Sequence, residues 1–204
     1  MLSNNMKFNT WFPTVIGSAH CPFINDIQSK YKKIIKNYTP NENGFINHPI
    51  HRNKKFKKLN DWITEEVNKF SQEHHFAFKY EMKESWIWDY KVEAYQDFHA
   101  HAGYTISTIF FLEGDKEDVP IIFKNPIEDM KNALDLHPHD SNDPKKFTSF
   151  TYKTCLYPPQ SGMLLVWRSY VEHRIDPKRS TKKRIVFVYN FDPKSNPCQK
   201  VRTY

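Results

Sequence analysis

The sequence has few of the features that mark several common protein classes. Only 5 of its 204 residues are glycine, and neither a G-x-G-x-x-G stretch nor a Walker-type loop is present, which argues against a glycine-rich nucleotide site. Cys21, Cys155 and Cys198 show no paired spacing, so neither a disulfide framework nor a zinc knuckle is indicated. No apolar run approaches membrane-spanning length and the start lacks a signal-peptide core. We therefore expect a soluble cytoplasmic protein.

Positive charge is concentrated in two places. The formal net charge is +7, and much of it lies in residues 52–58 and 178–184. Solvated surface is the ordinary explanation for such clusters, and an acidic partner or a nucleic acid is the alternative. Aromatic residues are not interleaved with the clusters as they are in a platform that stacks single-stranded bases. An acidic macromolecule thus stays open as a partner, with nucleic acid as a secondary option, and the sequence leaves the oligomeric state open.

Helical periodicity is confined to the first part of the chain. Apolar residues recur at helical spacing from Pro22 to Tyr38 and again from Lys55 to His74. Residues 8–16 are expected to form a short extended entry, and a polar loop separates the two helices. We expect the helices to lie as a layer against a sheet, so that residues 1–76 form a mainly helical flank.

From about residue 77 the pattern changes to that of β-strands. Residues 125–160 carry little periodicity and indicate a long insertion, with a helical turn near Glu128–Leu134, and residues 192–204 form a tail. Helices followed by strands are typical of the α+β class, here a single domain over 1–204 with a double-stranded β-helix (jelly-roll or cupin-like) core in 77–191. The strands are expected within 85–95, 105–112, 119–123, 162–167, 171–175 and 184–191.

Three separated pieces of sequence indicate a metal centre. His99 and His101 are one residue apart, so on an extended strand their side chains point to the same side. His173 can meet them only if the fold brings two strand ends together. Arg184 lies eleven residues later in an apolar β-run, where an unpaired guanidinium is costly. This is the layout of a non-haem iron site with an anchored acidic co-substrate.

At this point the chain resembles the Fe(II)/2-oxoglutarate-dependent oxygenases. The closest branch is common in phages and marine bacteria and is distantly related to prolyl hydroxylases, so the host cytoplasm is the expected compartment if a phage encodes the protein. The resemblance touches most of the chain, although its strong motifs occupy 86–114 and 158–191. The matching stretches are Trp11–Thr14, Trp86 with Tyr90, His99–His101, Pro159–Pro177 and Arg184–Asn190.

The resemblance implies a dioxygenase, a hydroxylase that uses O2 and couples decarboxylation of 2-oxoglutarate to succinate with oxidation of a substrate. Fe(II) would be held by His99, His101 and His173, with no catalytic residue beyond the metal centre. Arg184 would form a bidentate pair with the C5 carboxylate of 2-oxoglutarate, a task that suits its planar fork. The cofactor-binding set would also include Tyr90, whose hydroxyl would point at a co-substrate carboxylate, and Asn190 as a weaker contact.

The acidic position of the usual superfamily triad is occupied here by His101. Either three imidazoles hold the iron, which is the interpretation we adopt, or His101 lies behind the ligands and the metal keeps an extra open position. Imidazole suits Fe(II), but loss of a carboxylate removes a negative charge and could change the preferred metal. Asp97 is a weaker candidate ligand. Trp88, Glu93 and Trp167-Arg168 also depart from the branch's pattern.

Other interpretations remain open from the sequence. A second H-x-H, His137-Pro138-His139, is expected in an exposed loop of the insertion, which family analogy puts near the active-site mouth. One alternative function is a three-histidine cupin-type dioxygenase without co-substrate. Another is a non-catalytic jelly-roll module that binds an acidic partner. The sequence does not identify the substrate, which is a protein side chain, a nucleobase or a small metabolite.

Overall fold

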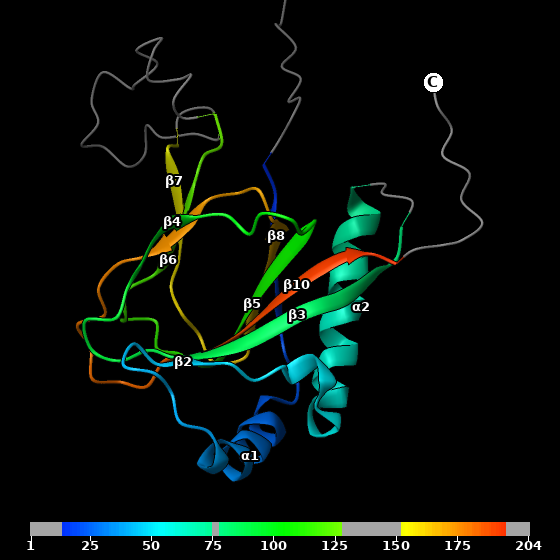
Figure 1. Cartoon of the computed structure of the whole chain (residues 1–204). Helices are drawn as coiled ribbons and strands as arrows, with labels where there is room; N and C mark the ends of the chain where they lie inside the picture. Colours follow the sequence, from blue (N-terminus) through cyan, green and yellow to red (C-terminus); the bar gives the residue numbers. More distant parts are fainter. Residues whose placement is uncertain (1–13, 75–77, 128–151, 195–204) are drawn as a thin grey trace, which may run out of the picture.

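The computed structural model describes residues 14–74, 78–127 and 152–194, which form two β-sheets and two helices (Figure 1). Short 3-10 turns precede α2 and follow α1. The helices are α1 (Ile24–Ile34) and α2 (Lys57–Glu73), and the strands are β1 (Ile16–His20), β2 (Phe45–Ile46), β3 (Tyr80–Asp89), β4 (Gln96–His99), β5 (Ile106–Glu113), β6 (Ile121–Lys124), β7 (Thr154–Tyr157), β8 (Met163–Arg168), β9 (His173–Ile175) and β10 (Ile185–Pro193).

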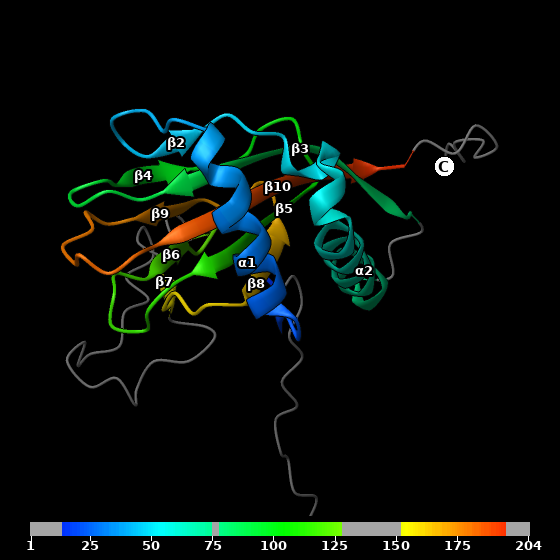
Figure 2. The same cartoon turned by 90° about the horizontal axis from the view of Figure 1, so that it is seen from below.

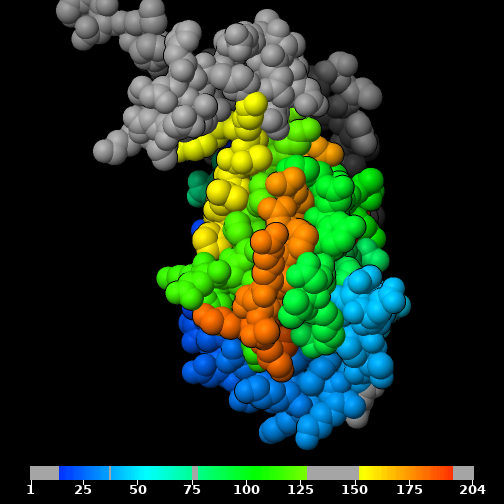
Figure 3. All heavy atoms as spheres, turned by 90° about the vertical axis from the view of Figure 1, so that its left-hand side faces the viewer, coloured from blue at the N-terminus to red at the C-terminus, as the bar shows by residue number. Residues whose placement is uncertain are grey.

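The two sheets face each other as the layers of a double-stranded β-helix, which confirms the expected fold class. The larger sheet has the strand order β1-β8-β5-β10-β3-β2, and the smaller has the order β4-β9-β6-β7. Neighbouring strands within each sheet are antiparallel. In Figure 1 the smaller sheet lies on the side of the larger sheet that faces away from α2. In Figure 3 the orange segment around and after β9 runs along the outer face of the smaller sheet, between green segments.

The central strands β5, β8 and β10 of the larger sheet are buried along most of their length because both faces of the sheet are covered there. Along β10, Ile185 and Phe187 belong to the core on the helical side, whereas Val186 and Val188 belong to the core between the sheets. The run Ile106–Leu112 on β5 divides in the same way. Each strand therefore contributes to two cores, and the one between the sheets surrounds the candidate site.

Both predicted helices are present, each somewhat shorter than expected. They cover the outer face of the larger sheet (Figure 2), and the ring of Tyr31 on α1 lies 5.7 Å from that of Phe187 on β10. Leu59, Ile63 and Val67 form the buried stripe of α2 at the spacing that an amphipathic helix requires. Within the described residues, no helix is both long enough and apolar enough to span a membrane.

Several short elements differ from the sequence-based expectation. β1, β2 and β7 were not predicted, and β7 lies within the 125–160 segment that was assigned to an insertion without strands. The strand expected within 85–95 begins earlier, at Tyr80, and ends at Asp89. Elements of two to five residues leave too short a pattern to recognise. The helical turn predicted near Glu128–Leu134 lies outside the described residues.

Gly44 fixes the turn that closes the larger sheet beside the candidate site. Its φ is +97°, and a Cβ added there would lie 1.9 Å from the backbone oxygen of Asp89. The carbonyl of Gly44 accepts a 2.8 Å hydrogen bond from the Asp89 amide. Glycine is therefore required at this position both for its backbone conformation and for the close approach to β3.

We expect Gly44→Ala to destabilise the protein by about 3 kcal/mol or more, since overlap with Asp89 adds to the cost of about 1 to 2 kcal/mol for a left-handed residue with a Cβ. Gly103 is the matched control, because its φ is +90° but an added Cβ would meet nothing within 4 Å. Gly103→Ala should lower the free energy of unfolding only by the about 1 to 2 kcal/mol that a left-handed residue with a Cβ costs. Urea unfolding of both variants measures the difference, and equal losses would contradict this account.

Candidate metal centre

The three predicted histidines come together at the end of the smaller sheet. His99 is the last residue of β4 and pairs with His173, the first residue of β9. His101 lies in the turn that follows, where its amide donates to the Ser169 carbonyl at 3.0 Å. One possible ligand atom from each histidine lies within 4.8 Å of the others. In the part of the chain that the structure describes, this is a group with the donors and spacing that a metal ion needs.

The expectation that His99 and His101 share an extended strand is wrong in its detail. β4 ends at His99, so strand alternation does not direct the two side chains to one side. Instead, the turn after His99 returns toward Ser169, and the rings of His99 and His101 stack with centroids 5.4 Å apart. Convergence therefore depends on this turn as well as on the pairing of β4 with β9.

Each imidazole has its Nδ1 atom occupied by a hydrogen-bond partner. Nδ1 of His99 lies 2.8 Å from the Asp97 carbonyl oxygen, and Nδ1 of His173 lies 3.3 Å from that of Val171. Nδ1 of His101 lies 2.7 Å from the side-chain oxygen of Asn190. Since a carbonyl oxygen can only accept, each Nδ1 carries the proton and each Nε2 keeps a lone pair. That is the protonation pattern of histidines that bind a metal through Nε2.

Burial among aromatic rings favours the neutral forms of His101 and His173. The Trp167 ring lies 4.9 Å from that of His173, and the Trp86 ring lies 5.7 Å from that of His101. Burial, followed by the neighbouring His99 and His101, lowers the pKa of His173 from 6.5 to about 3. Burial also lowers the pKa of His101. Neutral imidazoles are the form that binds metal ions.

Arg184 is fully buried just before β10 begins. Its Nη1 donates to the Val119 carbonyl at 2.6 Å, while Nε and Nη2 have no hydrogen-bond partner among the described residues. The guanidinium lies 5.2 Å from the centre of the Tyr90 ring. Burial lowers the Arg184 pKa, and Tyr90 and Asp118 oppose that effect. A buried guanidinium with two unsatisfied nitrogens is suited to an anion.

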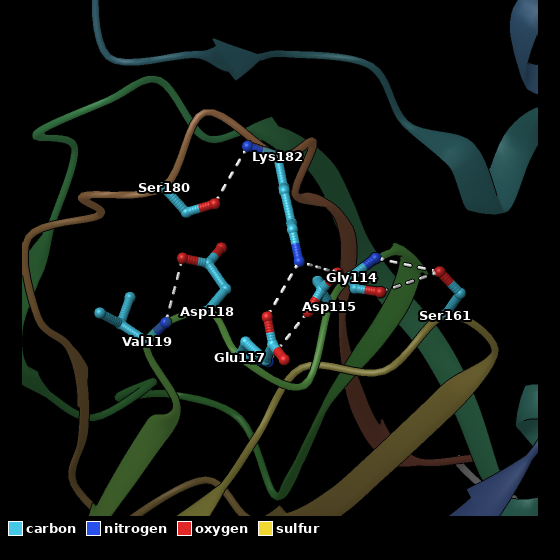
Figure 4. A network of polar contacts seen from close by, with 8 residues as sticks. All are labelled: Gly114, Asp115, Glu117, Asp118, Val119, Ser161, Ser180 and Lys182. Atoms are coloured by element: carbon cyan, nitrogen blue, oxygen red, sulfur yellow. Dashed lines mark hydrogen bonds and ion pairs between the residues drawn. The ribbon is translucent and has the colours of Figure 1, made fainter.

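A network of polar contacts holds the loop that supports Arg184 (Figure 4). Nζ of Lys182 donates to Asp115 at 2.8 Å and to Glu117 at 3.2 Å. These contacts tie the loop before β6 to the segment that leads into β10, and Val119 lies at the end of that loop. The Val119 carbonyl is thereby fixed where it accepts the Arg184 hydrogen bond.

Arg184 and Tyr90 both lie outside the lining of the cavity beside the histidines. That cavity is lined by the three histidines together with Trp86, Trp88, Trp167, Gln96, Ile109, Ile121, Ile175 and Val188. Tyr90 and Arg184 are not part of its lining. The Tyr90 hydroxyl donates to Gln96 Oε1 at 2.6 Å, and its ring stacks on that of Trp88. One chain of contacts from the cavity to the guanidinium therefore runs through Gln96 and Tyr90.

The remaining candidates from the sequence have other surroundings. Asn190 hydrogen-bonds to His101, Ser107 and Glu84, so its predicted contact with a co-substrate stays a prediction. Asp97 is outside the three-histidine group, and its carboxylate accepts from the Phe98 amide. His137 and His139 lie outside the described residues. Sequence reasoning missed Gln96 and Glu84, because no local motif marks either residue.

The basic cluster at 178–184 is only in part an exposed charged surface, to which Arg179 and Lys183 belong. Lys178 and Arg184 are buried, and Lys182 forms ion pairs with Asp115 and Glu117. The cluster at 52–58, in contrast, has exposed lysines at positions 54, 55, 57 and 58. Two of the basic residues at 178–184 therefore lie in the interior of the protein, and the others lie at its surface.

A family model described as "Putative 2OG-Fe(II) oxygenase" matches residues 84–190, which is more than half of the chain. The matched region contains the three histidines, Arg184, Tyr90 and Asn190. Among curated proteins, none matches the sequence.

Solved structures share the fold at low sequence identity. An oxidoreductase of the 2OG-Fe(II) oxygenase family from Burkholderia pseudomallei is 12% identical with a TM-score of 0.56, over 86% of this chain and 84% of that one. A Pseudomonas putida prolyl-4-hydroxylase is 12% identical with a TM-score of 0.58, over 89% and 94%. HygX from Streptomyces hygroscopicus, crystallised with nickel and 2-oxoglutarate, is 11% identical with a TM-score of 0.56, over 89% and 84%.

The lowered pKa of His173 predicts a pH-dependent stability of the metal-free protein. Between pH 6.5 and about 3 the unfolded chain binds a proton at His173 that the folded protein does not bind. The free energy of unfolding should therefore fall with falling pH in this window, by up to about 1.4 kcal/mol per pH unit from this residue. Urea unfolding with a chelator present, from pH 7 to 5, measures the slope. A His173→Asn variant with the same slope as the wild type would contradict the assignment.

Proposed function

Because the chain belongs to the 2OG-Fe(II) oxygenase family, we propose that it is a non-haem iron dioxygenase that couples decarboxylation of 2-oxoglutarate (2OG) to succinate with oxidation of a second substrate. The observation that carries the proposal is the site itself. Ligand atoms of three histidines lie within 4.8 Å of one another, and a fully buried arginine nearby has two unsatisfied nitrogens. A cation and a carboxylate would satisfy these groups.

In this proposal His99, His101 and His173 hold the ferrous ion through Nε2. Their Nδ1 protons are engaged by other acceptors, so the rings need not rotate or lose a proton to bind. Bound iron supplies the redox chemistry with O2, which no side chain at this site supplies. All three protein ligands are neutral, and a dicarboxylate co-substrate would bring the negative charge that they lack.

Arg184 would bind the distal carboxylate of 2OG. Its Nε and Nη2 atoms form an unused fork, and the low dielectric of the interior strengthens a charge-assisted pair there. Arg184 and Tyr90 lie outside the cavity lining, so the Tyr90–Gln96 hydrogen bond would have to open when a dicarboxylate binds there. The freed Tyr90 hydroxyl would then donate to the same carboxylate. Asn190 is proposed only as a weaker contact.

The indoles of Trp86, Trp88 and Trp167 would keep bulk water out of the site. A largely apolar wall strengthens every electrostatic contact inside the cavity. The substrate is proposed by class alone, as a protein side chain, a nucleobase or a small metabolite. The exposed lysines at 54, 55, 57 and 58 leave an acidic macromolecule as a candidate partner.

We expect His99→Ala and His173→Ala to abolish 2OG-dependent succinate formation and Fe(II) binding, because two imidazoles and water bind iron weakly. Arg184→Met should raise the KM for 2OG by about 100-fold, since it removes a charge-assisted pair. His20→Ala and Arg179→Met are matched controls, because both residues are exposed. Succinate release and bound iron are the measurements.

Two outcomes would contradict the proposal. Oxygen consumption that does not depend on 2OG would favour a three-histidine dioxygenase without co-substrate. Binding of an acidic partner that survives chelation and the His99→Ala change, in a protein that binds no metal, would favour a non-catalytic module.

Tyr90→Phe should raise the KM for 2OG by about tenfold and leave kcat within about twofold, because one hydrogen bond to a charged group is lost. Tyr189→Phe is the matched control. Its hydroxyl is also buried, has no partner among the described residues, and lies in the core on the helical side of the sheet. If both variants leave the KM unchanged, the role proposed for Tyr90 is wrong.

A further inference from the structure

Behind His101, polar side chains form a row across the inner face of the larger sheet. Asn190 on β10 pairs with Glu84 on β3 and with Ser107 on β5. The neighbouring residues of the same face, such as Val188, are apolar and belong to the core between the sheets. Polar groups at this depth are retained only where their hydrogen bonds are made.

The side-chain amide of Asn190 is the centre of this row. Its oxygen lies 2.7 Å from His101 Nδ1 and accepts from the Ser107 hydroxyl at 2.9 Å. Its nitrogen donates to Glu84 Oε2 at 3.3 Å. The Ser107 hydroxyl is also within 2.7 Å of that of Ser169. Every member of the row therefore has a partner.

The orientation of the Asn190 amide decides which nitrogen of His101 carries the proton. With the amide oxygen toward His101, Nδ1 must donate, and Nε2 keeps its lone pair. With the amide reversed, Nδ1 would have to accept, and the proton would move to Nε2, where it blocks a metal. The hydroxyls of Ser107 and Ser169 can donate or accept, so they are compatible with both orientations.

Glu84 removes this ambiguity, because a carboxylate only accepts. The amide nitrogen of Asn190 must face Glu84, and its oxygen must then face His101. The other two histidines do not need such a device, since their Nδ1 atoms face the backbone carbonyls of Asp97 and Val171. Of the three histidines, only His101 has a side-chain amide as the partner of its Nδ1, and the orientation of that amide could be reversed.

We propose that Glu84 is a positioning residue that sets the orientation of the Asn190 amide and thereby holds His101 in the tautomer that binds metal through Nε2. The tautomer assignment stands on the hydrogen bonds alone, whereas its consequence for metal affinity rests on the proposed function. Glu84 itself is exposed, and its side chain accepts from Asn190, which in turn contacts His101.

The test is nitrogen NMR of the imidazoles in the metal-free protein at a pH where they are neutral, together with a Zn(II) titration against a competing chelator. The wild type should show His101 protonated at Nδ1 only. Glu84→Leu should show both tautomers and bind Zn(II) about tenfold more weakly or worse, as is usual when a partner of a ligating histidine is lost.

Glu84→Gln is the decisive control, because its side-chain amide can donate as well as accept and so no longer fixes the direction of the contact with Asn190. It should show both tautomers of His101, as Glu84→Leu does. Glu81→Leu on the same strand should have no effect on either measurement. Glu84→Leu with an unchanged tautomer would overturn the proposal, as would Glu84→Gln with His101 protonated at Nδ1 only, since a group that only accepts would then not be needed.

The two proposals fail separately. If the wild type binds no divalent metal, the proposed function is wrong, and the tautomer of Glu84→Leu still decides the role of Glu84. If the wild type binds Zn(II) and the tautomer is indifferent to Glu84→Leu, only the positioning role is lost.

Discussion

The register between β4 and β9 determines whether this protein has a metal centre at all. Both strands are short, and His99 faces His173 as the last pair of their ladder. A slip of one residue would turn every side chain of β4 to the opposite face of the smaller sheet. β9 also pairs with β6, where His173 faces Phe123, and these strands pack on the larger sheet through the core between the sheets. Burial of that core therefore sets the register that the histidines need.

Much of this architecture could be predicted from the sequence, because its main signals are long. The runs that form β5 and β10 are rich in apolar and aromatic residues, and the two helices repeat their apolar residues over several turns. The histidines and Arg184 were found from residue type and spacing, and the structure brings the three histidines together. The double sheet with a helical flank followed from the order of these elements.

The rest could not be predicted because it depends on relations between strands. Nothing local indicates that Glu84 faces Asn190, since that contact follows from the register of β3 with β10. The position of His101 beyond the end of β4 depends on a turn, not on strand alternation. The packing of Arg184 against Tyr90, outside the cavity lining, follows from the tertiary structure, and spacings along a chain carry no information about which ring contacts a guanidinium.

Three of the five tryptophans of the chain line the cavity, and this gives the protein a built-in optical reporter. The ring of Trp167 lies 4.9 Å from that of His173, and the ring of Trp86 lies 5.7 Å from that of His101. Emission from these indoles will respond to a paramagnetic ion held between the imidazoles, while Trp62, packed on Phe110 at the helical face, supplies a background that the ion scarcely perturbs. Occupancy of the centre can thus be followed in solution without any added dye.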